Sequence, residues 1–170
     1  MPNHGRNTLA ALSKLTLLLL MFILPPDVRS GNGEDDIVDK YISPGVQFGY
    51  GFGKGWFIGS QMTFGLNYDE SAIAVGTTLG TRRYFDAQKT SMRYWDIQRV
   101  EDLGLGVGVG IAATKLKDSE TWEYGPRIKL WVGALLLPTY DYTYTMDQEK
   151  SNIHNFGGMG VLPLGGWMNR

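Results

Sequence analysis

Large apolar and small side chains alternate with a period of two along most of the chain. Between residues 42 and 53 the even positions are mainly bulky, whereas the odd positions hold serine, glutamine or glycine. Residues 103–112 show the same pattern in its clearest form, with leucine, valine and isoleucine alternating with four glycines and an alanine. This period is typical of β-strands that have two different faces. The mature chain is therefore predicted to be all-β.

Turn lengths support one continuous sheet, because a hairpin keeps its bulky side chains on one face only if the loop preserves parity. Phe52 and Trp56, for example, are both at even-numbered positions, so the loop between them needs an odd number of residues. Three residues separate them. A turn is expected at Pro138-Thr139-Tyr140, since one strand from 127 to 145 would be too long. The pattern predicts an antiparallel up-and-down β-barrel of about eight strands, near 41–52, 56–67, 72–86, 92–98, 103–117, 124–137, 141–146 and 154–168.

The glycine-rich face indicates which side of the sheet lines the interior of the barrel. On a water-exposed face, glycine weakens a strand without compensation. In a small membrane barrel, bulky side chains face lipid and small or polar ones fill a narrow lumen. We therefore expect a membrane barrel, with a soluble barrel or sandwich as the alternative. Aromatic residues gather near the expected strand ends and suggest two interfacial girdles. One rim has Tyr50, Phe52, Trp56, Phe57, Tyr84, Phe85, Tyr94, Trp95, Trp122 and Tyr124, and the other has Tyr41, Tyr68, Tyr140 and Trp167.

The N-terminus has the pattern of a leader. His4, Arg6 and Lys14 precede ten mainly apolar residues, 15–24, which as a helix would cover only about half of a bilayer core. We therefore expect a cleavable signal peptide over 1–30, a flexible acidic tail over 31–40 and the barrel domain over 41–170. An uncleaved short anchor is the alternative.

Composition excludes several classes of function. The net charge of −1 argues against a nucleic-acid-binding protein, which should be basic. The absence of cysteine excludes disulfides and thiolate metal sites. His154 is the only histidine beyond the leader, so neither a metal site nor a cofactor is expected.

Over residues 41–168 the alternation resembles the small outer-membrane β-barrel superfamily of bacteria, whose members have eight strands. The resemblance implies location in the cell outer membrane, contact with outer-membrane lipid and a barrel-insertion machinery as a partner during biogenesis. Two features depart from the family pattern. Trp167 is followed by Met168-Asn169-Arg170 rather than ending the chain, and Pro163 falls within the expected last strand.

Several charged residues lie at the alternating positions that otherwise hold small side chains and are expected to face inward. Buried charges must be paired or hydrated, so these residues are expected to form either a salt-bridged plug, which we favour, or a gated pore or proton path. The predicted lumen charge network consists of Arg82, Asp86, Asp96, Arg127, Lys129 and Asp141.

These features predict a non-enzymatic barrel with a narrow or plugged lumen and a structural, membrane-integrity or small-pore role. A soluble periplasmic or secreted barrel that binds an apolar ligand is the main alternative. A lipid hydrolase that uses Ser151, His154 and a carboxylate, Asp147 or Glu149, is a weaker one. We expect His154 to be a solvated loop residue, and the oligomeric state remains open.

Overall fold

The computed structural model describes residues 38–68, 73–101, 104–133, 136–145, 152–162 and 164. The predicted signal peptide, most of the predicted acidic tail, Pro163 and Trp167 lie outside these residues. Eight strands are present in the described part: β1 (Val38–Gly51), β2 (Gly55–Tyr68), β3 (Ile73–Tyr84), β4 (Ser91–Glu101), β5 (Leu105–Lys115), β6 (Glu123–Val132), β7 (Leu136–Thr143) and β8 (Ile153–Val161). Because β1 begins at Val38, the last three residues of the predicted tail belong to a strand.

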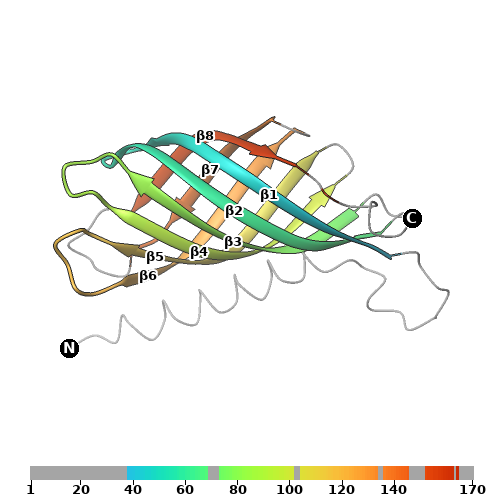
Figure 1. Cartoon of the computed structure of the whole chain (residues 1–170), viewed down its shortest axis with the longest axis horizontal. Coiled ribbons are helices and arrows are strands. Elements are labelled where there is room, and N and C mark those ends of the chain that lie inside the picture. The colour runs from blue at the N-terminus through green and yellow to red at the C-terminus, as the bar shows by residue number, and fades with distance from the viewer. Residues whose placement is uncertain are drawn as a thin grey trace, which may run out of the picture.

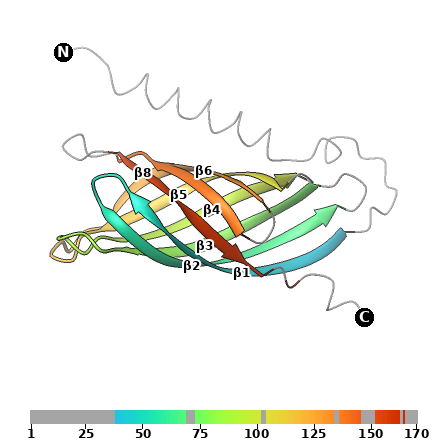
Figure 2. The same cartoon turned by 90° about the horizontal axis from the view of Figure 1, so that it is seen from above.

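The strands form one closed antiparallel barrel in sequence order, in which β8 pairs with β1 (Figure 1). The predicted fold class and strand number are confirmed. Figure 2 shows the strong tilt of the strands relative to the long axis. No helix in the described part of the chain has both the length and the apolar character needed to cross a bilayer.

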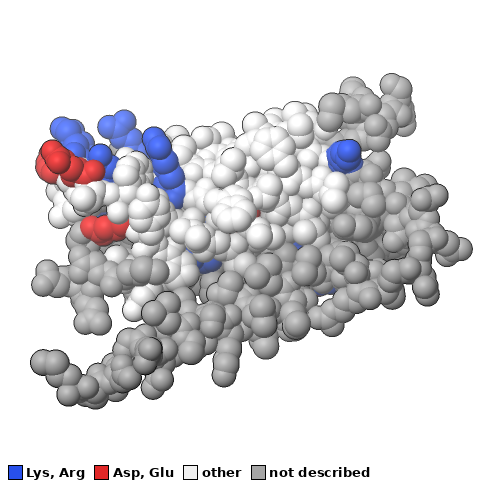
Figure 3. Space-filling view, turned by 90° about the horizontal axis from the view of Figure 1, so that it is seen from below, with Lys and Arg blue, Asp and Glu red and all other residues white. Residues whose placement is uncertain are grey.

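The two ends of the barrel differ. At one end, on the left of Figure 1, lie the connections 52–54, 85–90 and 116–122, together with Thr143 at the end of β7 and Ile153 at the start of β8, and we call this end the loop rim. The opposite end, the terminal rim, contains Val38 and Val161 together with connections of three or four residues. Lys, Arg, Asp and Glu side chains gather at the loop rim, whereas the described surface beside it is largely free of them (Figure 3).

Most of the bulky apolar side chains face outward, whereas the interior holds the small and polar side chains together with several aromatic rings. On β1 and β2, Val46, Phe48 and Ile58 are each more than half exposed, whereas their neighbours Gln47 and Phe57 are buried. On β5, Leu105 is 54% exposed and the alternating Gly106 and Gly108 are buried. This arrangement follows directly from the two-residue period of a strand. It is the inverse of the arrangement in a water-soluble barrel, whose apolar side chains line the interior.

The turn expected at Pro138-Thr139-Tyr140 is wrong. Strand β6 ends at Val132, and Gly133 adopts a φ of 117°, a conformation that favours glycine. Pro138 instead lies within β7, paired with Gly158 of β8, while the ladder to β6 begins only at Thr139. A missing amide is tolerated where a strand lacks one neighbour.

The predicted aromatic girdle is partly wrong. Phe57, Tyr84 and Tyr94 point into the barrel and are at most 4% exposed, because they occupy the inward parity of their strands. Phe52, Trp56, Phe85, Trp95 and Tyr124 do face outward. Tyr140, expected at the opposite rim, lies beside His154 near the loop rim.

Candidate functional site: the charged interior of the barrel

Five of the six predicted lumen residues lie inside the barrel and contact one another directly or through shared partners. Each is at most 2% exposed, and they come from four strands, β3, β4, β6 and β7. Their positions follow from strand parity, which places every second residue inside. The five are Arg82, Asp96, Arg127, Lys129 and Asp141.

Asp141 is the centre of the ion pairs. Its Oδ2 atom lies 2.7 Å from Nη1 of Arg82 and 3.3 Å from Nη2 of Arg127. Its Oδ1 atom accepts a hydrogen bond of 2.8 Å from the amide of Asn155. Arg127 also forms an ion pair with Asp96. Each buried carboxylate therefore has at least one cationic partner, as buried charges require.

Two of the interior contacts cross the full width of the barrel. Arg82 lies on β3 and Asp141 on β7, so four strand steps separate them in either direction around the closed sheet. The same separation holds for Gln61 on β2 and Lys129 on β6, whose ammonium donates a hydrogen bond of 3.1 Å to the Gln61 amide oxygen. Side chains from opposite walls therefore meet inside the barrel.

Amide and phenol groups connect the ion pairs to one another. Gln47 accepts a hydrogen bond of 2.7 Å from Nε of Arg82 and donates to Gln61 and to the Tyr94 hydroxyl. The Tyr94 hydroxyl in turn donates to the Gln61 amide oxygen over 3.1 Å. Arg82 and Lys129 are thereby linked through neutral side chains of β1, β2 and β4. Connected networks of this kind are stronger than their separate bonds because the surroundings exclude water.

Aromatic rings cover the remaining faces of the cations. The guanidinium carbon of Arg127 lies 4.0 Å from the Tyr94 ring centroid, and that of Arg82 lies 4.5 Å from the Phe57 centroid. The Lys129 ammonium lies 5.1 Å from the Trp131 ring. Cation–π contacts of this kind gain strength when water is excluded.

The inward glycines make room for these rings. A Cβ atom on Gly80 would overlap the Tyr94 ring, and one on Gly106 would overlap the indole of Trp131. Both rings come from a neighbouring strand and lie over the glycine. The glycine-rich face predicted to line a cramped interior therefore has a specific cause, since large aromatic side chains occupy the space above it.

Asp86 does not belong to this network. Strand β3 ends at Tyr84, two residues earlier than expected, so the inward parity does not extend to Asp86. Its carboxylate instead accepts hydrogen bonds from the amide and the hydroxyl of Thr90, at 2.7 and 2.5 Å. Asp86 thus stabilises the connection between β3 and β4 rather than the interior. The Asp–Thr spacing across this connection is the signal that could have indicated a turn.

His154, expected in a solvated loop, is the second residue of β8. Its Nδ1 atom lies 2.8 Å from the Tyr140 hydroxyl, and its ring centroid is 4.8 Å from that of Tyr142. Ser151, Asp147 and Glu149, the other candidate hydrolase residues, lie outside the described part of the chain. Within the described part, no group of three histidine or carboxylate residues is placed to hold a metal ion.

The fold and its interior together define a closed eight-stranded antiparallel barrel with an apolar outer wall and an internally paired polar core. No protein-family model matches the sequence, and no curated protein matches it. Among solved structures, the N-terminal β-barrel domain of Pseudomonas aeruginosa OprF is 12% identical, with a TM-score of 0.47 over 74% of this chain and 96% of that chain. The Yersinia pestis outer membrane protein Ail, studied in a phospholipid bilayer nanodisc, is also 12% identical, with a TM-score of 0.40 over 73% of this chain and 99% of that chain.

Proposed function

We propose that this chain is a transmembrane β-barrel of the bacterial outer membrane, with a closed interior and a structural, non-enzymatic role in membrane integrity. The observation that carries the proposal is the inverted placement of side chains. The outer wall carries exposed residues such as Phe48, Ile58 and Leu130, while the interior holds ion pairs. In water such a continuous apolar surface would drive association, whereas in lipid it is matched to its surroundings.

The size of the barrel agrees with this role. Seven of the eight strands contain at least nine residues, which is about the length that a tilted strand needs to cross a bilayer. The barrel has no edge strand, because β8 pairs with β1. Closure matters in lipid, where an unpaired backbone group has no water to bind. The longer connections of the loop rim are expected to face the cell exterior.

The closed interior rests on the contacts across the barrel. Arg82–Asp141 and Lys129–Gln61 each join opposite strands, and the rings of Tyr94 and Phe57 pack against the guanidinium groups. These side chains occupy the path that an ion would take. We therefore infer that the resting barrel conducts ions poorly and that the network serves as a plug.

Cell fractionation combined with gel mobility tests the membrane assignment. The full chain, expressed in a Gram-negative host, should be recovered in the outer-membrane fraction. It should also migrate differently with and without heating, because a closed barrel resists unfolding by detergent. Purification as a folded, water-soluble monomer without detergent would refute the proposal.

The orientation of β5 disfavours the soluble alternative. A soluble barrel that binds an apolar ligand requires Leu105, Val107 and Val109 to line its interior. Leu105 is instead 54% exposed, and the buried positions between these residues are glycines. The interior also contains charged groups rather than an apolar cavity, so it offers little to an apolar ligand.

A further inference from the structure

A row of mostly small side chains crosses the outer wall of the barrel obliquely. Its members are consecutive register partners on six adjacent strands, so they lie side by side on the same face of the sheet. In order from β7 through β8, β1, β2 and β3 to β4, the row consists of Leu136, Gly160, Val46, Ser60, Thr81 and Arg93.

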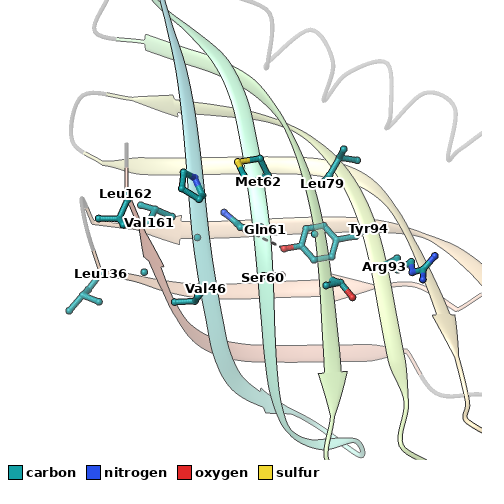
Figure 4. Close-up of a pocket in the computed structure, with 15 residues that line it drawn as sticks. Val46, Ser60, Gln61, Met62, Leu79, Arg93, Tyr94, Leu136, Val161 and Leu162 are labelled. Atoms are coloured by element: carbon teal, nitrogen blue, oxygen red, sulfur yellow. Dashed lines mark hydrogen bonds between the residues drawn. The ribbon is translucent and has the colours of Figure 1, made fainter. Parts of the chain in front are cut away.

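Larger side chains stand along one side of this row and form a hollow with it, which we call the trough. Met62 and Leu79 lie along one side of it, and the volume of the hollow is about 1070 Å³ (Figure 4). Figure 4 shows Leu136, Val46, Ser60 and Arg93 following one another across the strands. The floor of the trough lies low, close to the backbone, because Gly160 has no side chain and Ser60 and Thr81 have short ones.

The trough runs from one rim of the barrel toward the other. Arg93 is the third residue of β4 counted from the loop rim, whereas Leu136 is the first residue of β7, at the terminal rim. The row covers five of the eight strand spacings of the closed barrel, or about 24 Å along the curved wall at roughly 4.8 Å per spacing. The trough is thus long and apolar over most of its length, and a hydrocarbon chain that follows the curve of the wall fits along it.

Cations gather at the loop-rim end of the trough. Arg93 and Lys115 both lie against the ring of Trp122, at 5.0 and 5.9 Å from its centroid. Arg83 is exposed on the same face, and both Arg83 and Lys115 pair in register with Ser91. Within the described residues, these three cations form no ion pair with a carboxylate. A trough with three cations at one end complements a lipid with an anionic headgroup.

We propose that the trough binds a phosphate-bearing lipid of the outer leaflet, lipid A, with a phosphate on Arg93, Lys115 and Arg83 and an acyl chain along the row toward Leu136. Arginine pairs with phosphate through two parallel hydrogen bonds, which makes it suited to this headgroup. The apolar trough adds a contact that a free phosphate ion cannot make. The inference rests on the proposed membrane location, which places the loop rim in the outer leaflet.

Native mass spectrometry of the full chain in detergent micelles, titrated with lipid A, tests the proposal because it counts bound lipids and bound chains together. The headgroup variant combines Arg93→Gln with Lys115→Gln, and Lys40→Gln at the terminal rim is its matched control. The trough variant is Gly160→Leu, with Gly160→Ala as its control. A Cβ atom at Gly160 would meet its neighbours at 3.7 and 3.9 Å, which is ordinary contact, so the backbone accepts a side chain at this outward position.

We expect one lipid A to be retained by the unaltered chain and by both controls. Each cation removed should weaken retention about fivefold, given the usual strength of one basic side chain at an anionic lipid surface, and Gly160→Leu should weaken it at least as much. Lipid A without its phosphates should bind weakly, and inorganic phosphate should not displace the intact lipid.

Several outcomes would overturn the inference. The headgroup variant could retain lipid A as well as the unaltered chain does, the lipid without phosphates could bind as well as intact lipid A, or inorganic phosphate could displace the lipid. The spectra could also show a dimer of the chain instead of a lipid complex, with the dimer absent in Gly160→Leu. Heat-modifiable mobility, measured on the same samples, separates this failure from failure of the membrane assignment. Loss of lipid binding with retained mobility contradicts only the lipid site, whereas absence of the mobility shift contradicts the membrane barrel itself.

Discussion

The guanidinium of Arg82 on β3 lies 2.7 Å from the carboxylate of Asp141 on β7, although these two strands stand opposite each other in the barrel. No backbone pairing connects the two strands. The ion pair is therefore a tertiary bond across the interior, and Arg127 shares the same carboxylate. The stability of the barrel should depend strongly on this one acidic residue.

Asp141→Asn should destabilise the barrel markedly. The amide preserves the shape of the side chain but removes the charge that compensates Arg82 and Arg127. Breaking a buried ion pair by removing one partner costs about 3–5 kcal/mol, because the other charge stays buried. Urea unfolding in lipid vesicles measures the loss, with Asp118→Asn in an exposed connection as the control. Equal midpoints for the two variants would contradict the central role of Asp141.

Lys129→Met, in contrast to Asp141→Asn, should not destabilise the barrel markedly. Lys129 contacts the Gln61 amide oxygen, the Met159 sulfur and the Trp131 ring, and forms no ion pair within the described residues. An unpaired buried charge is costly, so an apolar side chain of similar volume should change the free energy of unfolding by less than about 1 kcal/mol or increase it.

Arg127→Met is the comparison for Lys129→Met. It removes a cation that pairs with both Asp96 and Asp141, so it should cost about 3–5 kcal/mol in the same urea assay. If the two methionine variants lose the same stability, then Lys129 is not the weakly compensated charge that the geometry indicates.

Two glycines on β5 should respond differently to alanine. A Cβ atom on Gly110 would overlap the backbone oxygen of Trp95 on the neighbouring strand, which cannot move aside, whereas one on Gly108 meets its nearest atom at 3.5 Å. Gly110→Ala should therefore cost about 1–3 kcal/mol by overpacking, and Gly108→Ala should be tolerated. The fraction that regains the heat-modifiable form on refolding measures the difference. Equal behaviour would mean that the glycine row is not sterically constrained.

Removing both contacts across the barrel should open it to ions. The double variant Arg82→Ala with Lys129→Ala deletes the two long side chains that reach the opposite wall. In planar bilayers it should show discrete conductance steps, whereas the unaltered chain and the exposed-connection control Lys117→Ala should remain near the background. A steady conductance of the unaltered chain would contradict the plug and favour the small-pore role.

Most of the fold could be predicted from parity. The alternation around Gly104–Gly110 and the lengths of the turns were enough to predict eight strands and to assign an inward and an outward face. The main error concerned the turn between β6 and β7. Pro138 resembles a turn residue because it lacks an amide hydrogen, yet it lies in β7, one residue before the ladder to β6 begins. Gly133, whose positive φ makes the actual turn, resembles the many strand glycines.

The candidate site could be predicted only in part. Parity indicates that Arg82, Arg127 and Asp141 face inward, but it does not indicate which strands oppose each other or which side chains meet. Those contacts depend on the stagger and closure of the barrel. The roles of Gln47 and Tyr94 could not be predicted for the same reason, since an inward glutamine or tyrosine has no sequence signature that names its partner.

Site-directed spin labelling of β5 tests the central claim most directly, because the chain has no cysteine and a single introduced one can be labelled specifically. The label is attached to Val107→Cys in the vesicle-reconstituted chain, with Lys117→Cys in an exposed connection as the reference. A lipid-facing Val107 predicts high accessibility to oxygen and low accessibility to a water-soluble nickel complex, the reverse of the Lys117 site. Nickel accessibility equal to that at Lys117, or protection from both reagents, would show that the apolar face does not meet lipid and would contradict the account.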